Sequence, residues 1–282
     1  MIGLTAVFTW PVLIAELVIF GTAAFTTFFA PAHTDQFPMP IAWWRGLAIL
    51  NLIASPLVFM DMASGMAQLS WIQTVPFLPE ITGETVAGRI WVWRMWLVVI
   101  LAVTMWIPLR PKAAGAVAFI LSAVLIALGS ATSHAIDHGM LAIAIYFVHL
   151  AAAGLWLGAL LSLLMSARTG AESLLVVAPR VSSASAWSVA AIGLSGVVTA
   201  IQSLGWNLRV LIESPYGLTL LWKLMTAAPV VLLGAYNRYW EMPKLSQESV
   251  RVTLVRSVIG ECLLLIAVLA WSAILAATPP PH

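Results

Sequence analysis

Long apolar segments separated by short polar connections occupy nearly the whole chain. Each segment approaches the roughly 20 residues that a helix needs to cross a bilayer, and the short alternating strands of a membrane barrel are absent. The predicted fold class is therefore an all-α polytopic membrane bundle, with residues 1–282 forming a single integral membrane domain. Its eight predicted spans lie at about residues 4–30, 41–67, 88–107, 113–134, 140–166, 181–204, 216–239 and 251–276.

The connections between the spans are marked by prolines, which commonly interrupt helices. Residues 68–87 form the longest connection and are predicted to be a loop, and residues 205–215 are predicted to be a shorter, interfacial segment. The prolines that support these divisions are Pro31, Pro38, Pro40, Pro76, Pro79, Pro108, Pro111, Pro179, Pro215 and Pro243.

Composition agrees with a membrane protein and excludes several kinds of site. The chain is 62% hydrophobic and 9% charged, whereas a soluble domain carries about 25% charged residues. A formal charge of +2 without a basic block gives no indication of nucleic-acid binding. The single cysteine, Cys262, excludes an internal disulfide and a Cys-based zinc site. Because Walker, GxSxG and HExxH motifs are also absent, we do not expect an enzyme.

Basic residues concentrate at alternate connections and predict the orientation. The third, fifth and seventh connections are predicted to be cytoplasmic because Lys and Arg favour that side. The even connections hold only Arg89 and Arg209, and Arg45 adds to the odd side. Both termini are therefore predicted to face outward. The basic residues of the odd connections are Arg110, Lys112, Arg168, Arg180, Arg238, Lys244 and Arg251.

Three of the five histidines fall within residues 134–149. His134 and His138 lie one helical turn apart in a connection predicted to open outward, and His149 lies about 13 Å below the outer boundary of the fifth span. A histidine inside a bilayer is costly to place and marks a candidate functional site. The alternatives are a capping role for His134, a solvated His138, and a His149 bonded to a neighbouring helix.

Methionines gather on the same predicted side as these histidines. Met95 and Met140 begin the third and fifth spans, and three more close the second span. Imidazole together with thioether is a ligand set that suits Cu(I), although any single methionine is also a common filler of apolar cores. The predicted metal ligands are His134, His149, His138, Met62, Met66 and Met60.

Several polar residues lie inside the predicted spans. Glu16 and Glu261 are too deep to reach water easily, so each is expected to pair with a Lys or Arg or to carry a proton. For Arg94 and Lys223 the alternative to a place in the interior is that their charged ends extend toward the outer interface. The small-residue run AAAGLWLGAL predicts a close helix contact. The residues predicted to form the polar interior are Arg45, Arg94, Lys223, Glu261, Asn237 and Trp156.

Several segments resemble the CopD/PcoD copper-resistance membrane proteins. The helix that His149 opens, HLAAAGLWLGAL, is similar to a helix of that family, as are SPYGLTLLWKLM at 214–225 and GAYNR at 234–238. The step Ser133-His134-Ala135 and the last span, with Arg256, Glu261 and a TPPP end, resemble the family pattern too. In the first half, WWRG with Arg45 and IWVWR with Arg94 are similar.

The resemblance implies a multi-pass protein of the bacterial inner membrane with periplasmic termini, in agreement with the charge distribution. It also implies a copper transport protein, with copper delivered by a periplasmic copper-binding carrier, since the copper-binding domain fused to some relatives has no counterpart here. One position departs from the family. Tyr146 stands where an acidic residue often precedes the histidine, so a role for that carboxylate is not expected here.

Two other functions fit the same residues. Histidines on adjacent antiparallel helices can ligate haem iron axially, so a b-type haem protein with His134 and His149 as ligands is the main alternative, with Arg94 or Lys223 near the propionates. A scaffold that keeps its polar residues only for helix association is the third possibility, but it gives no reason for a deep His149.

Overall fold

The computed structural model describes residues 2–29, 40–133, 136, 138–206 and 208–281. These residues form long apolar helices and short helical segments without a strand among them. Eight helices are long and apolar enough to cross a membrane, which confirms the predicted all-α polytopic bundle. They are α1 (Ile2–Phe28), α2 (Ile41–Ala67), α5 (Val86–Thr104), α6 (Pro111–Ala131), α7 (Met140–Thr169), α8 (Ala171–Leu204), α10 (Pro215–Tyr236) and α11 (Glu248–Ala276).

Residues 68–87 were predicted to be a loop, and this prediction is wrong. The segment folds into α3 (Trp71–Thr74), the 3₁₀ turn η1 (Val75–Phe77) and α4 (Leu78–Glu84). Pro76 and Pro79 lie in the first turn of η1 and α4. A helix accepts proline there, because the first N–H groups have no partner within the helix. The short helix α9 (Leu208–Glu213) forms in the segment predicted to be interfacial.

The start predicted for the sixth span is also wrong. Helix α8 begins at Ala171 rather than near residue 181, and Pro179 lies within it. A proline inside a helix removes one backbone hydrogen bond. Burial of Leu174, Val177 and Ala178 favours the extra turns before and around it, because removing apolar surface from water stabilises a packed helix.

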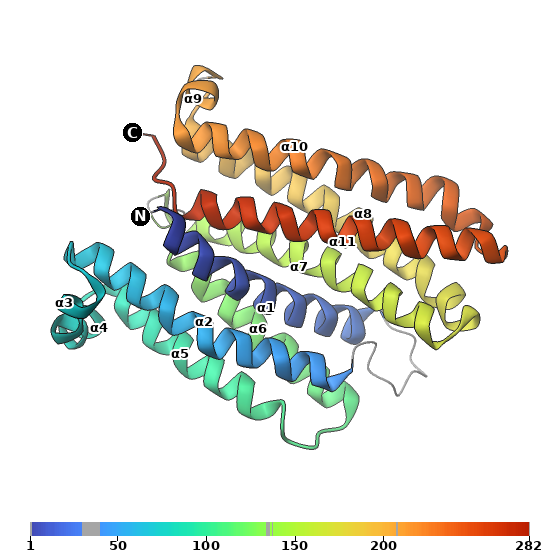
Figure 1. Ribbon diagram of the computed structural model, residues 1–282, viewed down its shortest axis with the longest axis horizontal. Coiled ribbons are helices and arrows are strands. Elements are labelled where there is room, and N and C mark those ends of the chain that lie inside the picture. Colours follow the sequence, from blue (N-terminus) through green and yellow to red (C-terminus); the bar gives the residue numbers. More distant parts are fainter. Residues whose placement is uncertain (1, 30–39, 134–135, 137, 207, 282) are drawn as a thin grey trace.

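Helix α1 lies at the centre of the bundle and contacts α2, α6, α7 and α11. As Figure 1 shows, α1 begins and α11 ends at the same end of the bundle, where α3, α4 and α9 also lie; we call it the termini end. The opposite end holds the α5–α6, α7–α8 and α10–α11 connections with the basic residues described above; we call it the basic end.

Three glycines allow α1 and α7 to approach closely. A Cβ atom at Gly21 would lie 1.7 Å from the carbonyl oxygen of Gly154, and one at Gly158 would lie 2.0 Å from the carbonyl carbon of Gly21. Backbone therefore meets backbone, as small residues permit in membrane helices. The close contact predicted from the AAAGLWLGAL run is confirmed.

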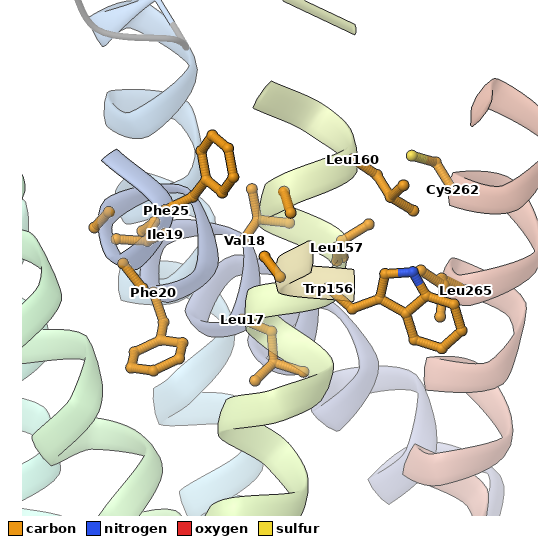
Figure 2. Packing of buried hydrophobic residues seen from close by; sticks show 14 of the residues in the cluster. Leu17, Val18, Ile19, Phe20, Phe25, Trp156, Leu157, Leu160, Cys262 and Leu265 are labelled. Atoms are coloured by element: carbon orange, nitrogen blue, oxygen red, sulfur yellow. The ribbon is translucent and has the colours of Figure 1, made fainter. Parts of the chain in front are cut away.

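The apolar core surrounds this α1–α7 contact. Leu17 and Phe25 of α1 and Leu157 of α7 are almost completely buried. Figure 2 shows the α1 side chains packed against α7, with Trp156 and Leu160 directed toward Cys262 and Leu265 of α11. The core thus fixes α7 between α1 and α11 and holds the polar faces of α7 in place.

Candidate functional site

His149 lies on the part of α7 that faces α8. It is half-buried, and its Nδ1 lies 3.0 Å from the hydroxyl oxygen of Ser195. Gly196 makes this approach possible, since a Cβ atom there would lie 3.3 Å from Cε1 of the imidazole ring. The structure therefore confirms a deep histidine bonded to a neighbouring helix.

The hydrogen bonds of Ser195 favour one tautomer of His149, whose ring also bonds the backbone of Ile192. The Ser195 hydroxyl donates to the backbone carbonyl of Ala191 at 2.5 Å. Its oxygen is then free to accept a hydrogen bond from Nδ1–H of His149, which leaves the lone pair on Nε2. Neutral imidazole held through its other nitrogen in this way is the form in which histidine binds metals.

Further polar groups of α7, α8 and α10 lie in the same half of the bundle as His149, near the termini end. The ammonium group of Lys223 on α10 interacts electrostatically with His149. The hydroxyl group of Tyr216 donates to Ser203 at 3.1 Å, and Tyr146 lies close enough to Tyr216 for an electrostatic interaction. Lys223 therefore lies near enough to His149 to influence it electrostatically.

The other predicted metal ligands occupy separate places or lie outside the described residues. Met60 and Met62 are half-buried on α2 and Met66 is exposed; α2 packs on α1 and α5. His138 is exposed, and His134 lies outside the described residues. Within the part of the chain that the structure describes, there is no group of three His, Cys, Asp or Glu residues able to hold a metal ion. Ligation by these six residues stays a prediction.

Glu261 forms a second polar centre, nearer the basic end. Its carboxylate accepts hydrogen bonds from Nε1 of Trp156 at 2.9 Å and from Nδ2 of Asn237 at 3.0 Å. Along α7, Trp156 lies about 10 Å beyond His149 toward the basic end. The structure therefore brings three of the predicted polar interior residues into direct contact.

Arg94 and Glu16 form a buried ion pair at 2.8 Å, with side chains only 5% and 4% exposed. A second guanidinium nitrogen of Arg94 donates to the carbonyl oxygen of Leu125 at 3.0 Å, and the group lies over the Trp91 ring. Arg94 is therefore buried against Glu16 and does not follow the alternative of extending toward the interface. The pairing expected for Glu16 is confirmed.

Arg45 lies apart from these centres, near the basic end. Its Nε donates to the carbonyl oxygen of Met105 at 3.1 Å, and its guanidinium lies over the Trp106 ring. Met105 directly follows α5, so Arg45 binds an otherwise unpaired carbonyl at the negative end of that helix. This contact indicates a structural role for Arg45.

Comparison with known proteins gives matches over most of the chain. The family described as "Copper resistance protein D-like, N-terminal domain" matches residues 2–142, and "Copper resistance protein D" matches residues 175–275. A "Copper resistance protein D" from Pseudomonas syringae pv. tomato is 29% identical over 248 residues, which cover 79% of this chain and 80% of that relative. No solved structure matches the chain significantly.

Proposed function

Because the chain belongs to the copper resistance protein D family, we propose that it transports copper across the bacterial inner membrane. Copper is the cargo, taken up at the termini end and released at the basic end. The proposed direction follows from the basic connections, since Lys and Arg favour the cytoplasmic side. A periplasmic copper-binding carrier would deliver the ion to the termini end.

The observation that carries this proposal is the state of His149. We infer that Nδ1–H donates to Ser195, which leaves Nε2 to bind copper at a depth of about 13 Å below the start of α7. One imidazole without a closed cage binds an ion weakly enough to release it, as conduction between successive sites requires. His134, His138, Met60, Met62 and Met66 would capture copper before it reaches His149.

Copper accumulation in cells that express the protein tests the proposal. We expect the wild type to raise the copper content above that of cells with an empty vector, and a His134→Ala/His149→Ala double variant to remove most of that increase. Immunoblotting would show that both proteins reach the membrane in equal amounts. Unchanged accumulation in the double variant would refute copper passage through these histidines.

The role of Ser195 gives a separate prediction. Ser195→Ala removes the group that orients His149 and is expected to weaken copper binding by roughly 10-fold to 100-fold, the usual effect of losing a group that orients a metal ligand. Ser188→Ala is the matched control, because Ser188 is a buried serine on the same helix. Equal copper affinities of the two variants, measured by competition with a chromogenic Cu(I) chelator, would contradict the orienting role of Ser195.

A further inference from the structure

A cavity of about 210 Å³ lies between α7, α8, α10 and α11 in the half of the bundle near the basic end. Glu261 and Trp156 line it together with Ser185 of α8 and Asn237. Asn237 begins the π-helical turn η3 (Asn237–Glu241) that directly follows α10. Interruptions of this kind are frequent at functional sites. The cavity is separate from the His149 site and larger than a single water molecule needs.

Oxygen acceptors converge on this cavity. Nδ2 of Asn237 donates its hydrogen bond to Glu261. The other amide atom of Asn237, the buried Oδ1, has no hydrogen-bond partner among the described residues. Asn237 is only 3% exposed. The buried hydroxyl oxygen of Ser185 likewise has no recorded partner within the described ranges. A buried acceptor without a donor is costly, and a bound ion is one explanation for it.

Two charged side chains line the cavity, Glu261 and Arg238, and the Glu261 carboxylate is the group that would hold a cation. Both oxygens of the Glu261 carboxylate accept N–H donors, an arrangement that suits the ionised form. Among the described residues, no Lys, Arg or His nitrogen lies within ion-pair distance of it. A buried carboxylate without such a partner is costly.

Arg238 stands where a cation would reach the cavity from the basic end. Its Nη1 donates to the backbone oxygen of Ser182 at 2.6 Å and to the hydroxyl of Ser182 at 2.8 Å. Arg238 and Ser182 also line a second cavity of about 400 Å³ together with Leu245. A guanidinium in this shared wall repels a divalent cation more strongly than a monovalent one, because the Coulomb energy scales with charge.

We propose that the cavity binds a hard monovalent cation of the Na⁺ class through Glu261, Oδ1 of Asn237 and the hydroxyl of Ser185. Carboxylate, amide and hydroxyl oxygens are ligands for hard cations, whereas a soft copper ion prefers sulfur and nitrogen. Met242 also lines the wall, but the converging polar atoms without partners are oxygens. The site is independent of copper and extends the function beyond the proposed transport.

Thermal unfolding of the purified full-length protein in detergent tests this site without copper. Sodium chloride is titrated with choline chloride holding the ionic strength constant. We expect Na⁺ to raise the Tm by about 5–10 °C at about 100 times its Kd. Ser185→Ala should move the titration midpoint about 3-fold to 10-fold higher, as expected from the loss of one neutral polar contact. Ser188→Ala should leave the midpoint unchanged, and Glu261→Gln should abolish the shift.

Three results would overturn the proposal. The first is a Tm that is the same in sodium chloride and in choline chloride. A Tm that changes only with pH falls under this result and would indicate a protonated Glu261. The second is a Na⁺ titration midpoint in Ser185→Ala equal to that of the wild type. This result can be interpreted even if Glu261→Gln fails to fold. The third is an equal shift with Ca²⁺. Because no copper is present, none of these results bears on copper transport by His149.

Discussion

Replacing Arg94 by leucine is expected to lower the free energy of unfolding by about 3–5 kcal/mol, the usual cost of removing one partner of a buried ion pair. The variant leaves the carboxylate of Glu16, which is only 3% exposed, without its cation. It also leaves the carbonyl oxygen of Leu125 without the guanidinium donor. Equilibrium unfolding in mixed micelles, followed by circular dichroism, measures the change.

Two further variants separate the ion pair from a general effect of losing an arginine. Glu16→Gln/Arg94→Leu removes both charges and should recover most of the lost stability, since the cost comes mainly from the uncompensated carboxylate. Arg256→Leu changes an exposed arginine on α11 and should alter stability by less than about 0.5 kcal/mol. Equal free energies of unfolding for Arg94→Leu and Arg256→Leu would show that the Glu16–Arg94 ion pair does not stabilise the protein as proposed.

Gly158→Ala is expected to destabilise the bundle by about 3 kcal/mol, at the upper end of the usual range for overpacking. The added methyl group would lie 2.0 Å from the carbonyl carbon of Gly21 and 2.3 Å from the amide nitrogen of Thr22. Both are backbone atoms that no side-chain rotation can move, so α1 and α7 must separate. Thermal unfolding of the detergent-solubilised protein measures the loss.

Gly193→Ala is the matched control on α8, since a Cβ atom there meets no heavy atom within 4 Å. It should be neutral or stabilising by about 0.5–1 kcal/mol, because alanine favours a helix over glycine. Equal unfolding temperatures for the two variants would show that the α1–α7 contact tolerates a methyl group.

The sequence predicted the spans well because length and hydrophobicity alone decide whether a helix can cross a bilayer. It also placed His149 and Trp156 inside the bundle, since each lies deep within a long apolar helix. Glu16 was not predicted as the partner of Arg94, because an arginine that reaches toward water and one that meets an acid on another helix have the same local sequence. Only the packing of α1 against its neighbours distinguishes them.

Ser195 and Ser185 were missed for a related reason. Helix α8 carries several serines, among them Ser182, Ser183, Ser185, Ser188 and Ser195, and each can bond within its own helix. Nothing local indicates that Ser195 meets His149 or that Ser185 opens into a cavity. The π-helical turn η3 begins at Asn237, within the GAYNR segment that resembles the family pattern.

Copper uptake into proteoliposomes is the direct test of copper transport through His149. Purified protein is reconstituted in vesicles that contain a fluorescent Cu(I) chelator, with Cu(I) supplied outside under reducing conditions. Because reconstitution can insert the protein both ways, vesicles are sorted by the accessibility of a terminal tag. We expect uptake from the termini end in the wild type and at least a tenfold slower rate in His149→Ala, with Ser188→Ala as fast as the wild type. Equal uptake by His149→Ala and the wild type would contradict it.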